Sequence, residues 1–353
     1  MSFSVKGSPS KIKWSSVQRI LVIRHRFIGD TILLAPFLSA LKSALPNHVE
    51  VDMMVAKGSG ELLEGHPAVH QLLYYESSRQ MLPILQARRY EVAFILKRSW
   101  SSAWLALQAQ IPIRIGFDTE ARGWMLTHPV AYKKGVHEAQ AFLNTLDAVG
   151  LPSHVPQAHP PQAKDWSFLT RANPLPPDLQ NQINTFKTEG RHCVLWHAVA
   201  SNSQKSLPES HWHAFWSELQ NREKLPPLAF FTIGTTQEAS YYQAFKTSNI
   251  PLINTCGRLT LPQSLHLVHQ MNLTLGVDSG PLHMAGVSGQ KVLSLFGPSA
   301  WERWHPLGAG VLPPIRLDLP CQPCELKVPC SFENRCLQGI SPIDLVDRFL
   351  SAI

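Results

Sequence analysis

The run DSGPLH, which begins at Asp278, combines residue types that suit a phosphorylated sugar. The apolar residues 273–277 predict a strand and Pro281 is typical of the start of a helix, so a tight turn is expected between them. Because the first N–H groups of a helix have no partner within it, they bind anions, and Ser279 and Gly280 are expected to hold a phosphate. The carboxylate of Asp278 is better suited to accept hydrogen bonds from sugar hydroxyls. The run therefore indicates a nucleotide-sugar ligand.

Polar side chains also follow two other predicted strands in this half of the chain. Ser201 and Lys205, in ASNSQKSLP, would supply a hydroxyl and an ammonium to a diphosphate, or would belong to a solvated loop. Glu238, after GTTQ, is either a ribose ligand or a carboxylate that the helix dipole stabilises. His283, in the first turn of the helix after DSGP, is a candidate for donor binding, with a structural histidine as the alternative.

A second candidate for chemistry lies near the N-terminus, in RHRFIGDTILLAP. A short apolar run at 20–23 predicts a strand, and Gly29 and Asp30 are expected directly before a helix that Pro36 interrupts or kinks. Asp30 is then either the N-cap of that helix or a general base that takes a proton from an attacking hydroxyl. No GxGxxG pattern follows this first strand, which argues against a dinucleotide oxidoreductase.

Four of the six cysteines fall in the segment CQPCELKVPCSFENRC. A tetrathiolate zinc or iron site is one interpretation, because thiolates are preferred ligands of these metals and a reducing compartment disfavours disulfides. Reduced thiols and a local disulfide are the alternatives. The four cysteines are Cys321, Cys324, Cys330 and Cys336.

The elements that must position these residues alternate between strand-like and helix-like runs, which indicates the α/β class with parallel sheets. The predicted organisation is an N-terminal α/β domain at 1–150, a linker at 151–185 and a C-terminal α/β domain at 186–339, which includes the cysteine segment. A helix is expected at 340–353. Ligands of such sheets bind beyond the carboxyl ends of the strands, so we expect a cleft between the two domains.

Composition narrows the class of protein. The chain has 353 residues, of which 44% are hydrophobic and 16% charged, as in globular proteins. The net charge of +7 favours anionic partners such as phosphorylated substrates or lipid headgroups, whereas no motif that reads nucleic acid is present. No apolar run reaches the length of a membrane span, and we expect a cytoplasmic protein.

Five motifs in order carry a family resemblance that extends from about residue 19 to the C-terminus. GDTILLAP, SNSQKSLPESHW, GTTQE, DSGPLHMAGVSGQKVLSLFGPS and the CxPC…C…CL segment together resemble glycosyltransferase family 9, the ADP-heptose:lipopolysaccharide heptosyltransferases. The resemblance implies a GT-B fold, in which the parallel sheets of two Rossmann-like domains face a central cleft. It also implies an inverting transfer of heptose from ADP-heptose to the lipid-linked inner core of lipopolysaccharide, without a metal or other cofactor in catalysis.

The resemblance also assigns roles to residues. Asp30 looks like the catalytic base, and Arg24 and Arg26 are candidates for contacts with an anionic acceptor. The residues that the resemblance assigns to donor binding are Ser201, Lys205, Glu238, Asp278, Ser279, Gly280 and His283.

The expected partners are therefore ADP-heptose, a lipid A-core acceptor and the cytoplasmic face of the inner membrane, with no nucleic acid. One alternative keeps the enzyme but replaces the acceptor by a protein, as in the autotransporter heptosyltransferases, which carry cysteine-bound iron. Another is a nucleotide-sugar-binding module without catalytic activity.

Overall fold

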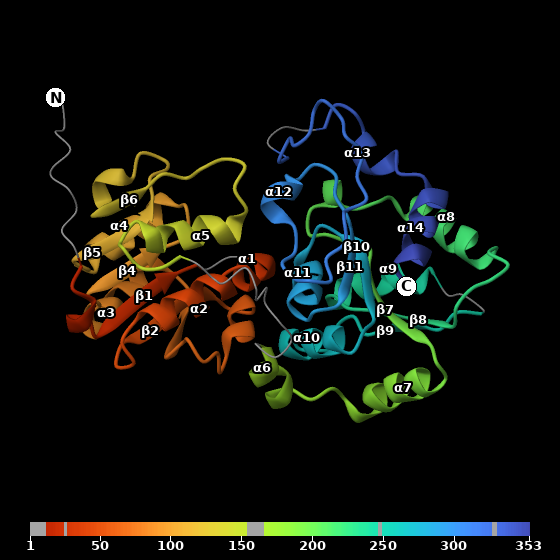
Figure 1. Ribbon diagram of the computed structural model, residues 1–353, viewed down its shortest axis with the longest axis horizontal. Coiled ribbons are helices and arrows are strands. Elements are labelled where there is room, and N and C mark those ends of the chain that lie inside the picture. Colours follow the sequence, from red (N-terminus) through yellow and green to blue (C-terminus); the bar gives the residue numbers. More distant parts are fainter. Residues whose placement is uncertain (1–11, 25–26, 154–165, 246–248, 327–329) are drawn as a thin grey trace. The chain divides into compact units, whose positions relative to one another are not determined.

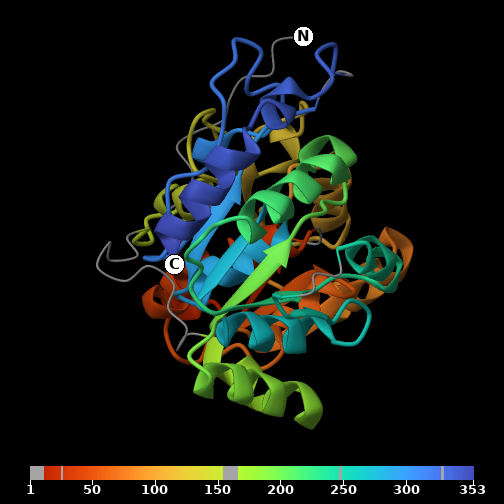
Figure 2. The same cartoon turned by 90° about the vertical axis from the view of Figure 1, so that its right-hand side faces the viewer.

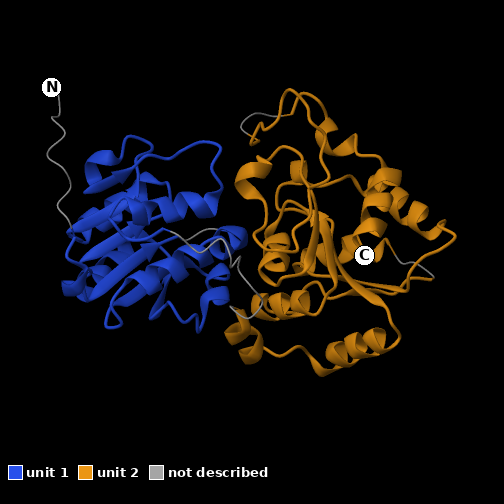
Figure 3. Cartoon of the chain, in the orientation of Figure 1, with its two compact units in different colours: residues 1–158 blue, residues 159–353 orange. Residues whose placement is uncertain are grey.

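The computed structural model describes residues 12–24, 27–153, 166–245, 249–326 and 330–353. The chain forms two compact units, residues 1–158 and 159–353 (Figure 3). The division falls inside the predicted linker at 151–185. Each unit contains one parallel β-sheet with helices, as the alternating sequence pattern predicts (Figure 1).

Unit 1 contains a six-stranded sheet in the order β3-β2-β1-β4-β5-β6. Its strands are β1 (Arg19–Ile23), β2 (Glu50–Ala56), β3 (Gln71–Tyr75), β4 (Val92–Ile95), β5 (Ile113–Phe117) and β6 (His128–Val130). Its helices are α1 (Ile28–Ile32), α2 (Ala35–Ala44), α3 (Ser78–Arg88), α4 (Trp100–Gln108) and α5 (Glu138–Asp147), with 3-10 turns η1 (Trp14–Ser16), η2 (Ser59–Leu63) and η3 (Gly123–Met125).

Successive side chains of β4 point to opposite faces of this sheet, and each face is covered by different helices. Ala93 and Ile95 pack in one cluster with residues of α3 and α4. Phe94 meets Phe37 of α2 instead, with ring centroids 5.3 Å apart. Burial on both faces explains why the strands of this unit read as nearly continuous apolar runs.

Unit 2 contains a five-stranded sheet in the order β11-β10-β7-β8-β9. Its strands are β7 (His192–His197), β8 (Leu228–Thr232), β9 (Leu252–Asn254), β10 (Leu273–Val277) and β11 (Lys291–Leu295). Its helices are α6 (Ser167–Ala172), α7 (Pro177–Thr188), α8 (Glu209–Gln220), α9 (Ala239–Gln243), α10 (Leu261–His269), α11 (Gly280–Val287), α12 (Trp301–Trp304), α13 (Arg335–Gln338) and α14 (Pro342–Ala352), with 3-10 turns η5 (Ser203–Lys205) and η6 (Thr236–Glu238). The helix expected at 340–353 is α14, which lies beside α8 (Figure 2).

An aromatic cluster forms the centre of the unit 2 core. Trp196 of β7 is fully buried and meets the rings of Trp212, Trp216, Tyr242 and Phe245 edge to face, with centroids 5.0 to 5.3 Å apart. Such edge-to-face pairs contribute beyond the area that they bury. The cluster fixes α8 and α9 against the strand that leads into the Lys205 loop.

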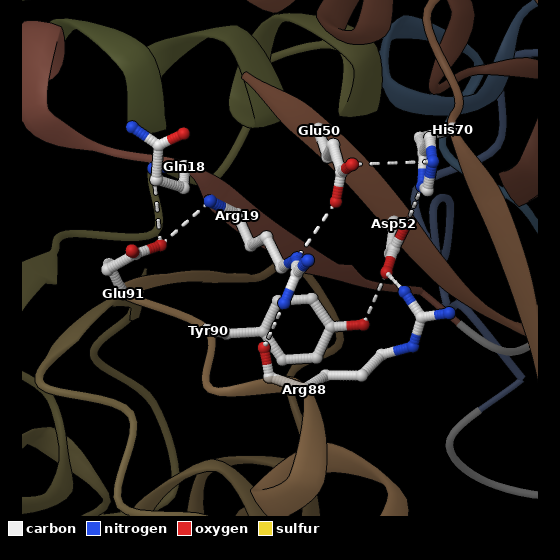
Figure 4. Close-up of polar contacts among 8 residues, drawn as sticks. All are labelled: Gln18, Arg19, Glu50, Asp52, His70, Arg88, Tyr90 and Glu91. Atoms are coloured by element: carbon white, nitrogen blue, oxygen red, sulfur yellow. Dashed lines mark hydrogen bonds and ion pairs between the residues drawn. The ribbon is translucent and has the colours of Figure 1, made fainter. Parts of the chain in front are cut away.

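A network of polar and charged side chains lies at the amino-terminal ends of the strands in the unit 1 sheet (Figure 4). The buried carboxylate of Asp52 accepts hydrogen bonds from the Tyr90 hydroxyl at 2.6 Å, Arg88 Nη1 at 2.5 Å and His70 Nδ1 at 3.0 Å. Burial, and then the hydrogen bond to Asp52, raise the pKa of Tyr90 far above its usual value. The network holds β2 to the segment between α3 and β4.

Candidate active site

The donor side of the candidate site is the carboxyl edge of the unit 2 sheet. Strand β10 ends at Val277, Asp278 is buried directly after it, and α11 begins at Gly280 with Pro281 in its first turn. Ser279 is the extended N-cap residue, and its hydroxyl donates to the carbonyl of Val277 at 2.8 Å. The strand, turn and helix N-terminus predicted for this run are all present, with the first N–H groups of α11 available to an anion.

The Lys205 loop meets this turn directly. Lys205 Nζ lies 2.7 Å from Asp278 Oδ2, although 73 residues separate the two in sequence. Strands β7 and β10 are hydrogen-bonded neighbours, so the loops that follow them emerge side by side. The side chain of Asp278 is buried, and the side chain of Lys205 is about 29% exposed. A diphosphate bound at the N-terminus of α11 would therefore have a cation beside it and a carboxylate oriented by that cation.

Ser201 lies in the same loop and is exposed. The loop around it is held by local hydrogen bonds, because Ala200 N donates to Ser206 Oγ at 2.8 Å and Gln204 N donates to Asn202 Oδ1 at 3.0 Å. Lys205 closes the 3-10 turn η5. The loop is thus an ordered turn whose residues 201–203 are exposed to solvent, and a contact of Ser201 with phosphate stays a prediction.

Glu238 acts as a cap. Its carboxylate accepts from the Thr235 N–H at 2.6 Å and the Thr235 hydroxyl at 3.0 Å, completing a capping box at η6. A Cβ on Gly234 would come 2.4 Å from Glu238 Oε2, so a larger residue at 234 would displace this carboxylate from its present position. The structure thus gives Glu238 a capping role, which the sequence analysis did not name, and a ribose contact stays a prediction. His283 is buried in the first turn of α11, and its contact with the donor also stays a prediction.

Asp30 is not the N-cap of the helix that contains it. Helix α1 begins at Ile28 with Phe27 as N-cap, so Gly29 and Asp30 lie inside the helix and the N-cap interpretation is wrong. The interruption expected at Pro36 is present, because α1 ends at Ile32 and α2 begins at Ala35 with this proline in its first turn. Asp30 is buried at the carboxyl end of β1, and its Oδ1 lies 2.8 Å from Arg24 Nη2.

The side chain of Arg24 is buried, and its guanidinium contacts three other residues. Its Nη1 donates to the Leu96 carbonyl at 3.2 Å, and its Nη2 lies between Asp30 and Glu138 Oε1, the latter at 3.6 Å. Glu138 is fully buried and accepts from the Tyr132 hydroxyl at 2.6 Å. The guanidinium is thus engaged inside the protein, and contact of Arg24 with an acceptor stays a prediction. Arg26 lies outside the described residues.

Comparison with known proteins decides the family. The family model described as "Glycosyltransferase family 9 (heptosyltransferase)" matches residues 79–335. The chain belongs to glycosyltransferase family 9. It is 23% identical over 303 residues to lipopolysaccharide heptosyltransferase 3 of Escherichia coli, covering 80% of this chain and 84% of the relative. It is 24% identical over 337 residues to lipopolysaccharide heptosyltransferase 1 of Pseudomonas aeruginosa, covering 89% and 88%.

Solved structures of family 9 share the fold. E. coli ADP-heptose lps heptosyltransferase II matches with a TM-score of 0.69 at 20% identity, covering 95% of this chain and 98% of that one. E. coli heptosyltransferase WaaC with ADP matches with a TM-score of 0.72 at 14% identity, covering 95% and 100%. The predictions of family 9, of a glycosyltransferase and of a GT-B-type α/β fold with two parallel sheets are confirmed.

The sequence analysis of this family 9 enzyme did not identify two residues that are linked to Asp30 through Arg24. Glu138 and Tyr132 lie more than 100 positions from Asp30, and no motif marks either one. A buried glutamate in the first turn of a helix reads from sequence as an ordinary N-terminal acidic residue. Only the packing of α5 against α2 and β5, which brings Glu138 to Arg24, shows this link.

The cysteine segment has no assembled metal centre. Among the described residues no group of three or more potential ligands is arranged to hold a metal, and the four cysteines are free thiols. Cys336 is buried in α13, while Cys321 is exposed and Cys324 and Cys330 are partly exposed. Burial, followed by the charges of the other three thiols, raises the pKa of Cys336. The iron-containing glycosyltransferase TibC of E. coli shares the fold with a TM-score of 0.55 at 13% identity, covering 95% of this chain and 76% of that one.

Proposed function

We propose that this family 9 enzyme transfers heptose from ADP-heptose to the inner core of lipopolysaccharide, with inversion at the anomeric carbon. The observation that carries the proposal is the Lys205–Asp278 pair at the N-terminus of α11, in a chain whose relatives are named lipopolysaccharide heptosyltransferases. An ammonium and a helix N-terminus attract a diphosphate, and an adjacent oriented carboxylate accepts hydrogen bonds from sugar hydroxyls.

In the proposed reaction, Asp30 takes the proton of the acceptor hydroxyl as that oxygen attacks the anomeric carbon. The bond from this carbon to the diphosphate oxygen breaks, and ADP leaves with the electron pair. Lys205 and the N–H groups of Ser279 and Gly280 stabilise the negative charge that develops on the diphosphate. Arg24 contacts Oδ1 of the Asp30 carboxylate, and Oδ2 is the oxygen that we propose accepts the proton.

The test is incubation of the purified protein with ADP-heptose and a panel of truncated core acceptors, read by mass spectrometry. The proposal predicts the mass of one heptose added to one class of acceptor. Transfer to a protein acceptor instead would identify an autotransporter-type enzyme. Binding of ADP-heptose without turnover on any acceptor would identify a nucleotide-sugar-binding module.

The location that we propose is the cytoplasmic face of the inner membrane, where a lipid-linked acceptor would be reached. In the part of the chain that the structure describes, no helix is long and apolar enough to cross a membrane. Peripheral association would then depend on surface contacts. Fractionation of cells, followed by salt washing of the membranes, tests this location.

We further propose that the cysteine segment binds a structural zinc or iron ion through Cys321, Cys324, Cys330 and Cys336. Thiolates are suitable ligands for both metals, and the four cysteines fall within 16 consecutive residues. Because the described residues do not bring three such ligands together, the thiols would have to move toward one another to bind the ion. Metal analysis of the purified protein is expected to find one equivalent, lost in Cys336→Ser. Metal-free protein with an unchanged melting temperature would contradict this proposal.

A further inference from the structure

Three tryptophans form an exposed aromatic surface on unit 1 for which the proposed reaction has no use. Trp100 and Trp104 of α4 and Trp124 of η3 are 42%, 36% and 64% exposed. The rings of Trp100 and Trp104 stack with centroids 5.3 Å apart, and Trp124 lies 6.3 Å from Trp104. Single exposed apolar residues are ordinary, whereas a contiguous group of large ones marks an interaction site. We call these three side chains the tryptophan surface.

The residues beneath the tryptophan surface hold it rigidly. Arg122 is completely buried, and its guanidinium donates to the carbonyls of Phe117 at 2.8 Å, Lys97 at 2.6 Å and Ser99 at 2.8 Å. These bonds join the segment that enters α4 to the segment that carries η3. The backbone segments that carry the three indoles are therefore held together, which lowers the ordering of the backbone that binding would require.

The position of α4 connects this surface to the acceptor side of the molecule. Trp100 and Trp104 are one turn apart, so they lie on one face of the helix, and Ala103 and Ala106 are buried on the other. Helix α4 follows the carboxyl end of β4, and Leu96 at that end accepts a hydrogen bond from Arg24, the partner of Asp30. The tryptophan surface thus begins at the sheet edge that carries the proposed base.

Charge and ring geometry favour a bilayer over a saccharide as the partner. Residues 1–158 contain 17 Lys and Arg against 11 Asp and Glu, whereas residues 159–353 contain 15 against 14. Lys97 and Arg98 directly precede Trp100, although the acidic Asp118 and Glu120 also lie between β5 and η3. Anionic lipids would therefore attract the unit as a whole more than this one patch.

The indoles themselves are suited to the membrane interface, where an apolar ring and a polar N–H are both accommodated. A platform for sugar rings needs open indole faces. Because the rings of Trp100 and Trp104 stack on each other, with centroids 5.3 Å apart and an interplanar angle of 20°, each shields part of one face of the other. We propose that the tryptophan surface docks unit 1 on an anionic lipid bilayer. The biological purpose of this docking rests on the proposed function, since a lipid-linked acceptor lies in such a bilayer, but the docking itself does not.

The experiment is co-sedimentation of the full-length protein with vesicles of phosphatidylglycerol and phosphatidylethanolamine, and with vesicles of phosphatidylcholine alone. The wild type is expected to prefer the anionic vesicles. Trp124→Ala and Trp100→Ala should each weaken that binding about tenfold, and the triple variant W100A/W104A/W124A should abolish it. Phe332→Ala, which removes a similarly exposed aromatic side chain from unit 2, is the matched control and should change nothing.

Unchanged vesicle binding by the triple variant would overturn the proposal, as would equal binding to both kinds of vesicle. Loss of binding to a lipid-free core oligosaccharide, with vesicle binding intact, would also overturn it and assign the surface to a saccharide. Trp124→Gln replaces the indole in a 3-10 turn by a polar side chain and is a second variant in case an alanine variant misfolds. Melting curves by circular dichroism show whether each variant is folded. Vesicle binding requires no turnover, so this experiment tests the docking proposal even if the protein has no heptosyltransferase activity.

Discussion

The assignment of Asp30 as the base makes a prediction whose size follows from its surroundings. Asp30→Asn removes the proton acceptor while keeping the shape of the side chain. Loss of a general base typically lowers the rate about 10²- to 10⁴-fold, and we expect kcat for heptose transfer to fall within that range. Donor affinity should change less than about twofold, since the donor-binding candidates all lie in unit 2.

The effect on folding should be modest because the buried cluster contains two carboxylates for one guanidinium. When a buried ion pair loses one partner outright, the cost is about 3–5 kcal/mol. Here Glu138 remains 3.6 Å from Arg24, so the guanidinium keeps a counter-charge after Asp30 is changed. We therefore expect a loss of only about 1–2 kcal/mol, which lowers the melting temperature by about 2–8 °C.

The assay is single-turnover transfer from ADP-heptose, with melting followed by circular dichroism on the same preparations. Glu138→Gln is the matched control: it perturbs the same cluster and should cost similar stability, yet it leaves the proton acceptor in place and should lower kcat less than about tenfold. Wild-type turnover by Asp30→Asn would refute the base assignment. Equal losses of kcat in the two variants would show that the cluster acts through its structure alone.

Three further outcomes are expected. Lys205→Ala should weaken ADP-heptose binding about 10- to 100-fold by calorimetry, because it removes a cation from the diphosphate and leaves Asp278 without its partner, whereas Lys205→Arg should retain most of the affinity. Asp52→Asn should lower the free energy of unfolding by about 3–5 kcal/mol in urea, against less than about 1 kcal/mol for Asp178→Asn in the exposed pair with Arg258. Burial lowers the pKa of His197 from its ordinary 6.5, so the unfolded chain takes up a proton first as the pH falls. The free energy of unfolding should therefore decline as the pH drops from about 6.5 toward the lower pKa that His197 has in the folded protein. The decline should be shallower in His197→Gln. Identical slopes for the two proteins would count against this reasoning.

The limits of sequence-based prediction are clearest at the short elements. Strands β6 and β9 were not predicted, because three residues are too few to show a period. Helix α7 lies largely within the predicted linker at 151–185, since it buries only Leu179 and Ile183 and its composition is otherwise polar. In contrast, the long apolar strands and the amphipathic α14 carry a periodic signal of their own, and their places follow from the sequence.

By itself, the sequence determined the α/β class, the family and the loops in which the candidate residues lie. These are properties of local patterns: a buried parallel strand needs an apolar run, and a turn before a helix N-terminus needs residues such as Asp278, Ser279 and Gly280. The DSGPLH run could therefore be predicted as a strand, turn and helix start without coordinates.

Only the tertiary structure decided how these residues pair. Lys205 reaches Asp278 because β7 and β10 are neighbours in the sheet, a register that no local pattern encodes. The sequence shows Arg24 only as one of several cations near the N-terminus, and packing places it beside Asp30 and Glu138. The sequence alone does not show which residue a charged side chain will contact, because that depends on which segments the hydrophobic core brings together.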